Sequence, residues 1–174
     1  MSAGEGERSA GIVIGKVTRI RDDKGLGRIE VEYPWLAEGE PVERMVSVSA
    51  PMAGPDAGIF FMPNVGDEVV LAFDQGHWDH PCVIGYLWNA QQRPPSSDER
   101  QRMIRSKNGH TIRFVDSTPN QGNSGALIIE DAGGSVITMT NGRMVIHSKG
   151  ALEIASDGEM VLQGRLVKRL GGPI

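Results

Sequence analysis

The sequence is poor in cysteine, in aromatic residues and in long apolar runs. Its 174 residues include one Cys, four Phe, three Trp and two Tyr. A single cysteine excludes a disulfide framework within the chain and a cysteine-rich zinc site. No apolar run approaches the roughly 20 residues of a membrane-spanning helix. The first ten residues, MSAGEGERSA, lack the basic and apolar segments of a signal peptide, so we expect the protein to be made in the cytoplasm.

The charge and the aromatic residues are distributed unevenly along the chain. Residues 1–90 hold all the aromatic residues except Phe114 and carry 7 Lys/Arg against 14 Asp/Glu, a charge of −7. Residues 91–174 carry 11 and 8, a charge of +3. The stretch QQRPPSSDER between them is typical of an extended spacer. We therefore predict a flexible N-terminal tail over 1–10, one domain over 11–90, a linker over 91–104 and a second domain over 105–174.

Short runs of strand-like residues between turn signals characterise the first domain. Four such runs cover residues 11–20, 27–31, 65–73 and 82–88, and residues 47–50 are a further candidate. No segment has the sustained 3.6-residue apolar period of a helix. The pattern predicts an all-β fold, with a five-stranded OB-fold barrel in this part of the chain. Many OB-folds bind single-stranded nucleic acid in a basic groove, but a charge of −7 would repel phosphate, so we expect no nucleic-acid partner.

Glycines recur every eight residues in the second domain. Aligned on them, the chain reads GSVITMTN, GRMVIHSK, GALEIASD and GEMVLQGR, and a similar unit, GALIIEDA, precedes these four. Because side chains alternate along a strand, residues two and four positions after each glycine should share one face. We expect the glycines to lie at strand corners: Gly125, Gly134, Gly142, Gly150 and Gly158. Residues 105–124 do not fit this register, and we expect an ordinary strand pair before the repeats begin at about residue 125.

The repeats place an apolar column on one side of the predicted strands. One strand and one turn per repeat make a stripe of strands rather than a closed coil, so one chain leaves the column uncovered. Three copies around a threefold axis would cover it, and we favour this trimeric prism over a monomeric solenoid. The predicted axial core is Leu127, Ile129, Val136, Met144, Ile146, Leu152, Ile154, Met160 and Leu162.

Three stretches, residues 11–36, 60–89 and 105–116, are followed by the eight-residue repeats. Together with the repeats, these stretches resemble the central spike of contractile injection machines, the family of phage baseplate assembly protein V and the VgrG spikes of type VI secretion. The resemblance implies an OB-fold followed by an intertwined trimeric β-helix, in a short form without N-terminal hub domains or a lysozyme domain. It also implies a homotrimeric structural protein of a baseplate or injection apparatus that punctures the target envelope and carries a tip or effector protein.

The two ends of the predicted spike have different expected partners. The resemblance implies that the OB end meets a tail hub or tube protein. The chain lacks the His-x-His of metal-bearing spike tips and ends bluntly, so the resemblance implies a separate PAAR-repeat tip protein. Its predicted interface is Leu170, Gly171, Gly172, Pro173 and Ile174.

The sequence has no catalytic motif, and we expect neither an enzyme nor a cofactor. His77 and His80 are the candidates for a metal site, but a polar hairpin loop is the favoured interpretation, and no metal is expected. Neighbouring carboxylates lie at strand ends and in turns, where solvated charge explains them. Two further hypotheses are a carbohydrate-binding module that stacks sugars on Trp35, Trp78 and Trp88, and an envelope-degrading enzyme.

Overall fold

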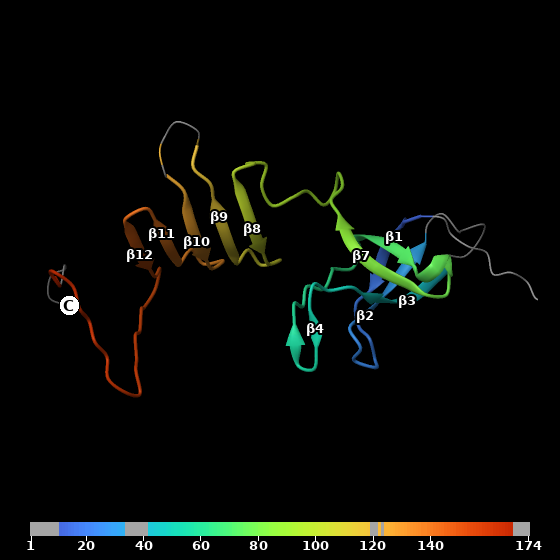
Figure 1. Cartoon of the computed structure of the whole chain (residues 1–174), viewed down its shortest axis with the longest axis horizontal. Coiled ribbons are helices and arrows are strands. Elements are labelled where there is room, and N and C mark those ends of the chain that lie inside the picture. The colour runs from blue at the N-terminus through green and yellow to red at the C-terminus, as the bar shows by residue number, and fades with distance from the viewer. Residues whose placement is uncertain (1–10, 34–41, 119–121, 123, 169–174) are drawn as a thin grey trace, which may run out of the picture. The chain divides into compact units, whose positions relative to one another are not determined.

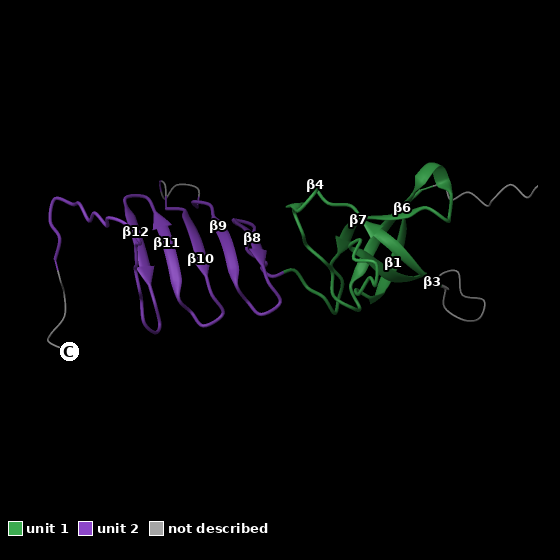
Figure 2. Ribbon diagram, turned by 90° about the horizontal axis from the view of Figure 1, so that it is seen from below, with its two compact units in different colours: residues 1–94 green, residues 95–174 purple. Residues whose placement is uncertain are grey.

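The computed structural model describes residues 11–33, 42–118, 122 and 124–168. The chain divides into two compact units between Pro94 and Pro95, inside the segment predicted to be a linker (Figure 2). The first unit is a barrel and the second an open sheet, so the all-β prediction is confirmed. Within the described ranges, no helix has the length and apolar character needed to cross a membrane.

Five strands close the barrel in the first unit (Figure 1). They are β1 (Val13–Arg19), β2 (Arg28–Tyr33), β3 (Val42–Val48), β6 (Glu68–Phe73) and β7 (Pro81–Leu87). The strand order is β1-β2-β3-β7-β6, with β3 parallel to β7 and every other pair antiparallel. This is the predicted OB-fold. The candidate strand at 47–50 overlaps only the end of β3.

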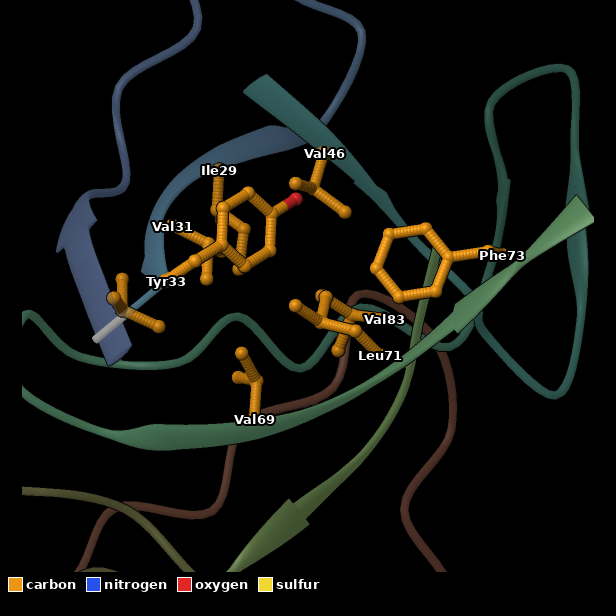
Figure 3. Close-up of a cluster of buried hydrophobic side chains, with 9 residues drawn as sticks. Ile29, Val31, Tyr33, Val46, Val69, Leu71, Phe73 and Val83 are labelled. Atoms are coloured by element: carbon orange, nitrogen blue, oxygen red, sulfur yellow. The ribbon is translucent and has the colours of Figure 1, made fainter. Parts of the chain in front are cut away.

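Alternating side chains from these strands fill the barrel (Figure 3). In β2 and β6, every second residue is buried, because successive residues of a strand point to opposite faces. The core comprises Val17, Ile29, Val31, Tyr33, Val46, Val69, Leu71, Phe73 and Val83. Eight of these nine residues are less than 2% exposed, so the barrel holds a complete core of its own.

Side-chain hydrogen bonds fix the turn between β1 and β2. The carboxylate of Asp22 accepts hydrogen bonds from the backbone N–H of Lys24 and Leu26, at 3.0 Å each. The guanidinium of Arg28 donates two more, from Nε at 3.0 Å and Nη2 at 2.9 Å. Arg28 is the main cause, with these backbone bonds, of a pKa for Asp22 well below its usual value. The turn is therefore set by charged hydrogen bonds rather than by apolar packing.

The second unit is a five-stranded antiparallel meander (Figure 1). Its strands are β8 (Gln101–Arg105), β9 (Thr111–Val115), β10 (Ala126–Glu130), β11 (Val136–Thr140) and β12 (Arg143–His147). They lie in the order β12-β11-β10-β9-β8. β8 occupies part of the predicted 91–104 linker, so that linker prediction was too long. The segment QRMIR that forms β8 follows a charged stretch and does not alternate apolar with polar residues, so it lacks a strand signal in the sequence.

The eight-residue repeat is visible in two forms. Gly142, with φ of 84°, closes the two-residue turn that pairs Thr140 with Arg143, and Gly134 has φ of 88°. Beyond β12 the repeat continues as turns. The hydroxyl of Ser148 accepts from the N–H of Gly150 and donates to the carbonyl of Ala151, and Ser156, Gly158 and Glu159 make the same two bonds eight residues on. Residues 150–168 form no strand, so the β-helix stays a prediction.

Candidate functional site

One face of the sheet in the second unit is apolar and uncovered. Cross-strand pairing in the meander aligns ten residues on this face, nine of which are apolar. We call it the apolar sheet face. Its residues are Arg102, Ile104, Ile112, Phe114, Leu127, Ile129, Ile137, Met139, Met144 and Ile146.

The apolar sheet face is accessible to solvent in the single chain. Ile104 is 54% exposed, Phe114 52%, Met144 60% and Ile146 50%. Scattered apolar residues are common on protein surfaces, but a contiguous stripe across five strands is typical of an interaction surface. The face therefore has the character of an interaction surface.

The opposite face of the same sheet is mixed and largely polar. Arg113 of β9 donates a hydrogen bond from Nη2 to Glu130 of β10 at 3.1 Å. Thr138, Thr140 and Arg143 continue the polar character across β11 and β12. Valine and isoleucine side chains lie among these residues, but the charged and hydroxyl groups make this face compatible with water. The sheet is thus amphipathic, with one face suited to burial.

The pairing corrects the predicted axial column at one position. Leu127, Ile129, Met144 and Ile146 share the apolar sheet face, as grouped from the sequence. Val136 pairs with Glu130 and lies on the opposite face, so placing it in the column was wrong. The two-residue turn at Gly142 pairs odd-numbered with even-numbered residues, so equal distances from successive glycines fall on opposite faces.

The sequence-based column also missed the residues that occupy the corresponding places. Ile137 and Met139 represent β11 on the apolar sheet face, and Ile112 and Phe114 represent β9. The alternation in HTIRF at 110–114 was the available signal for β9. Its offset from glycine differs from that of the later repeats, so the glycine spacing does not reveal it. Register across the sheet, which depends on turn length, decides which residues share a face.

The remaining predicted column residues lie in the segment after the sheet. Leu152, Ile154, Met160 and Leu162 are between 44% and 74% exposed and belong to no strand. β12 ends the sheet, so its outer edge pairs with no described strand of the same chain. An unpaired edge followed by exposed apolar residues provides both backbone and side-chain groups for another chain.

The loop between β6 and β7 contains the two candidate metal ligands. The rings of His77 and His80 have centroids 6.3 Å apart. Asp79 forms an ion pair with Arg44 at 3.2 Å, and the ring of Trp78 packs against Phe73 at 4.5 Å between centroids. Among the described residues, no group of three or more His, Cys, Asp or Glu side chains is placed to hold a metal ion.

The other predicted site residues are dispersed or lie outside the described ranges. Trp78 packs against the barrel core, which leaves it poorly placed to stack on a sugar, whereas Trp88 is 70% exposed. Trp35 and the predicted tip-protein interface at 170–174 lie outside the described residues. Of the two described tryptophans, therefore, only Trp88 is exposed enough to stack on a sugar.

Comparison with known proteins shows which family the barrel resembles. Residues 13–88 match the family described as the type VI secretion system/phage-baseplate injector OB domain. The barrel is similar to the injector OB domains. The match covers all five barrel strands, from β1 to β7. The resemblance to VgrG-like spike proteins is confirmed by this match and by the relatives of the chain.

Those relatives include several spike proteins. The type VI secretion system spike protein VgrG2a of Pseudomonas aeruginosa is 28% identical over 122 residues, which are 64% of this chain and 14% of that protein. VgrG1a of the same organism is 31% identical over 93 residues, 52% of this chain and 14% of that protein. The actin cross-linking toxin VgrG1 of Vibrio cholerae is 32% identical over 72 residues, which are 40% of this chain and 7% of that protein. The chain thus spans about one seventh of the first two relatives.

Proposed function

We propose that this chain is a non-enzymatic, homotrimeric spike protein that punctures the target envelope at the tip of a contractile tail or injection machine. The single observation that carries the proposal is the apolar sheet face, which follows an injector OB domain in the same chain. A stripe of nine apolar side chains, six of them exposed, can be buried by a partner, and three copies of the same stripe can meet around a threefold axis.

The burial available on the apolar sheet face is comparable in size to the cost of association. Completing the burial of a half-exposed Ile, Met or Phe contributes about 1 kcal/mol. The six exposed residues of this face give on the order of 6 kcal/mol per chain, or about 18 kcal/mol per trimer, and the partly buried Leu127, Ile137 and Met139 add less each. Association costs roughly 4–15 kcal/mol for each chain that joins, or about 8–30 kcal/mol for two joining events, so this sheet offsets much of the cost of the trimer.

Residues 150–168 supply the rest of the stem in this proposal. Their apolar residues recur at the eight-residue spacing of the turns at Ser148 and Ser156. In one chain these residues have no strand to pair with, whereas in a trimer each repeat can lie beside strands of the other two copies. The segment then forms the intertwined β-helix, and its apolar side chains extend the axial core. Trimerisation and folding of this segment become one event.

The mechanical role follows from such a stem. A prism of paired strands resists bending, since every backbone hydrogen bond along it is cooperative with its neighbours. It delivers the force of contraction to a narrow end. We propose that the OB end meets a hub or tube protein and that a PAAR-repeat tip protein caps the other end.

Cysteine cross-linking on the two faces of β10 tests the proposed trimer interior. In a Cys82→Ser background, Ile129→Cys places a thiol on the apolar sheet face, and Ile128→Cys places one on the opposite face of the same strand. Mild oxidation should link two copies through residue 129 and leave residue 128 unlinked, because only the former approaches its symmetry mates. Cross-links at 128 but not at 129 would invert the assignment of the two faces and overturn the proposal.

A further inference from the structure

A second uncovered apolar surface lies on the barrel. A groove of about 690 Å³ runs along the hairpin of β4 (Ala53–Gly54) and β5 (Ala57–Gly58) and the neighbouring part of β7. Apolar side chains form its walls: Met52, Ile59, Phe60, Phe61, Ile84 and Tyr86. Phe60 is 78% exposed and Phe61 58%. The apolar sheet face belongs to the other unit, so the proposed stem does not account for this groove.

Hydrogen bonds hold the groove walls in place. The hydroxyl of Tyr86 donates to the carbonyl of Phe61 at 3.1 Å, and the N–H of Ile59 donates to the carbonyl of Met52 at 3.0 Å. Gly58 has φ of 155°, and a Cβ there would lie 2.6 Å from the same Met52 carbonyl, so the hairpin can close only with glycine. The two phenylalanines are therefore held in solvent by a preorganised segment, as in a binding surface.

The groove is nearly free of charge on a strongly acidic barrel. Asp56 is its one charged lining residue and the one charged residue between positions 45 and 66. Residues 1–90 carry a net charge of −7, so two barrels repel each other over most of their surface but least at the groove. Walls of Phe, Tyr and Met without Lys, Arg or Glu have the composition of a protein interface core. An anionic partner such as nucleic acid gains nothing here.

The linker between the two units is short. On one side, Gln92 is bound to the barrel unit, where its Nε2 donates to Asp67 at 3.0 Å. On the other side, Asp98 binds the guanidinium of Arg100 at 2.9 Å, next to the start of β8. Only residues 93–97 lie between these anchors, and they reach at most about 20 Å when fully extended. Three barrels on one stem are thus confined at an effective concentration in the millimolar range.

We propose that the groove of each barrel is occupied by a neighbouring copy of this chain, which makes the barrels a second intersubunit contact. The inference rests on the proposed trimer. The short linkers keep neighbouring copies of the barrel close together, and the low charge of the groove reduces the repulsion between them there. The aromatic walls of the groove provide the apolar area that such a contact buries. The contact orders the three injector OB domains around the stem axis, so that they meet a hub as one rigid ring.

Photo-cross-linking in the full chain tests this contact. A benzophenone amino acid replaces Phe60, which conserves an aromatic ring, and in a matched control it replaces Ile12, which is 67% exposed and lies outside the groove. Light scattering of each variant before irradiation reports whether the trimer is present. Irradiated chains are then separated under denaturing conditions, and the linked peptides are identified by mass spectrometry.

The expected result is a trimer in which position 60 links to another copy, with a yield on the order of tenfold above position 12, because both positions are equally confined but only position 60 lies in the contact. A trimer in which position 60 links only within its own chain, links to nothing, or links no better than position 12 overturns the groove contact and leaves the spike proposal standing. A monomeric mass for the unsubstituted chain overturns both.

Discussion

An aspartate at Ile146 should dissociate the proposed trimer. Ile146 lies on β12, pairs with Ile137 of β11 and is 50% exposed on the apolar sheet face. Val145, the residue before it, pairs with Thr138 on the opposite face. Val145→Asp is therefore a matched control, since it adds the same charge to the same strand at a position that stays in contact with water.

The size of the effect follows from burial and desolvation. Each copy loses about 1 kcal/mol of apolar burial at Ile146, and each buried carboxylate costs several kcal/mol near the axis. Over three copies the penalty is on the order of 10 kcal/mol or more. This corresponds to a decrease of about 10⁷-fold in the association constant of the trimer, since every 1.4 kcal/mol is a factor of ten.

Light scattering measures the mass of each variant, and tryptophan fluorescence checks that the barrel is intact. All three tryptophans lie within residues 1–90, so their emission reports on the first unit and not on the stem. We expect Ile146→Asp to be a monomer with unchanged tryptophan emission and Val145→Asp to stay a trimer. A trimeric Ile146→Asp protein would refute the assignment of the apolar sheet face to the trimer interior.

Three further predictions concern the stability of each unit. Gly15→Ala should destabilise the barrel by about 1–3 kcal/mol, because its Cβ would lie 2.4 Å from a methyl group of Val31; urea unfolding followed by tryptophan emission measures this loss. Nothing lies within 4 Å of a Cβ at Gly85, so the control Gly85→Ala should cost under about 0.5 kcal/mol. Gly142→Ala should lower the stability of the second unit by about 1–2 kcal/mol, because φ at this turn is 84°; thermal unfolding followed by circular dichroism measures the change. Gly150→Ala is the control, because φ at Gly150 is not positive, and equal effects of the two variants would contradict the turn argument. The guanidinium of Arg100, together with backbone hydrogen bonding, lowers the pKa of Asp98 to about 2. The stability that the ionised Asp98 contributes is therefore present above the unfolded pKa of about 3.9 and is lost as pH falls toward 2. Asp98→Asn should remove that part of the pH dependence of the melting temperature, and an unchanged slope between pH 4 and pH 2 would contradict this assignment.

Local sequence patterns predicted the barrel strands because each strand carries its own turn signals and alternation. β2 and β6 alternate buried and half-buried residues along their whole length, and such a pattern needs no knowledge of the neighbouring strands. β3 was found only at its end. Its start at Val42 follows a proline-containing segment in which turn residues dominate the local signal.

Register across the second unit could not be predicted from the glycine spacing alone. The turn between β11 and β12 has two residues, whereas the connection between β10 and β11 has five, and these lengths decide whether Val136 or Ile137 joins the apolar sheet face. The barrel groove was also missed. Phe60 and Phe61 lie in a segment without strand-like alternation, and their exposure depends on contacts distant in the sequence, such as the hydrogen bond from the Tyr86 hydroxyl to the Phe61 carbonyl.

The mass of the full chain in solution tests the central claim most directly. One chain has a mass of 18.8 kDa, so multi-angle light scattering of a trimer gives three times that value, about 56 kDa. We predict this mass at micromolar concentration, with little dependence on dilution, because folding of the stem and association are coupled. A mass of 18.8 kDa under the same conditions would contradict the trimeric spike.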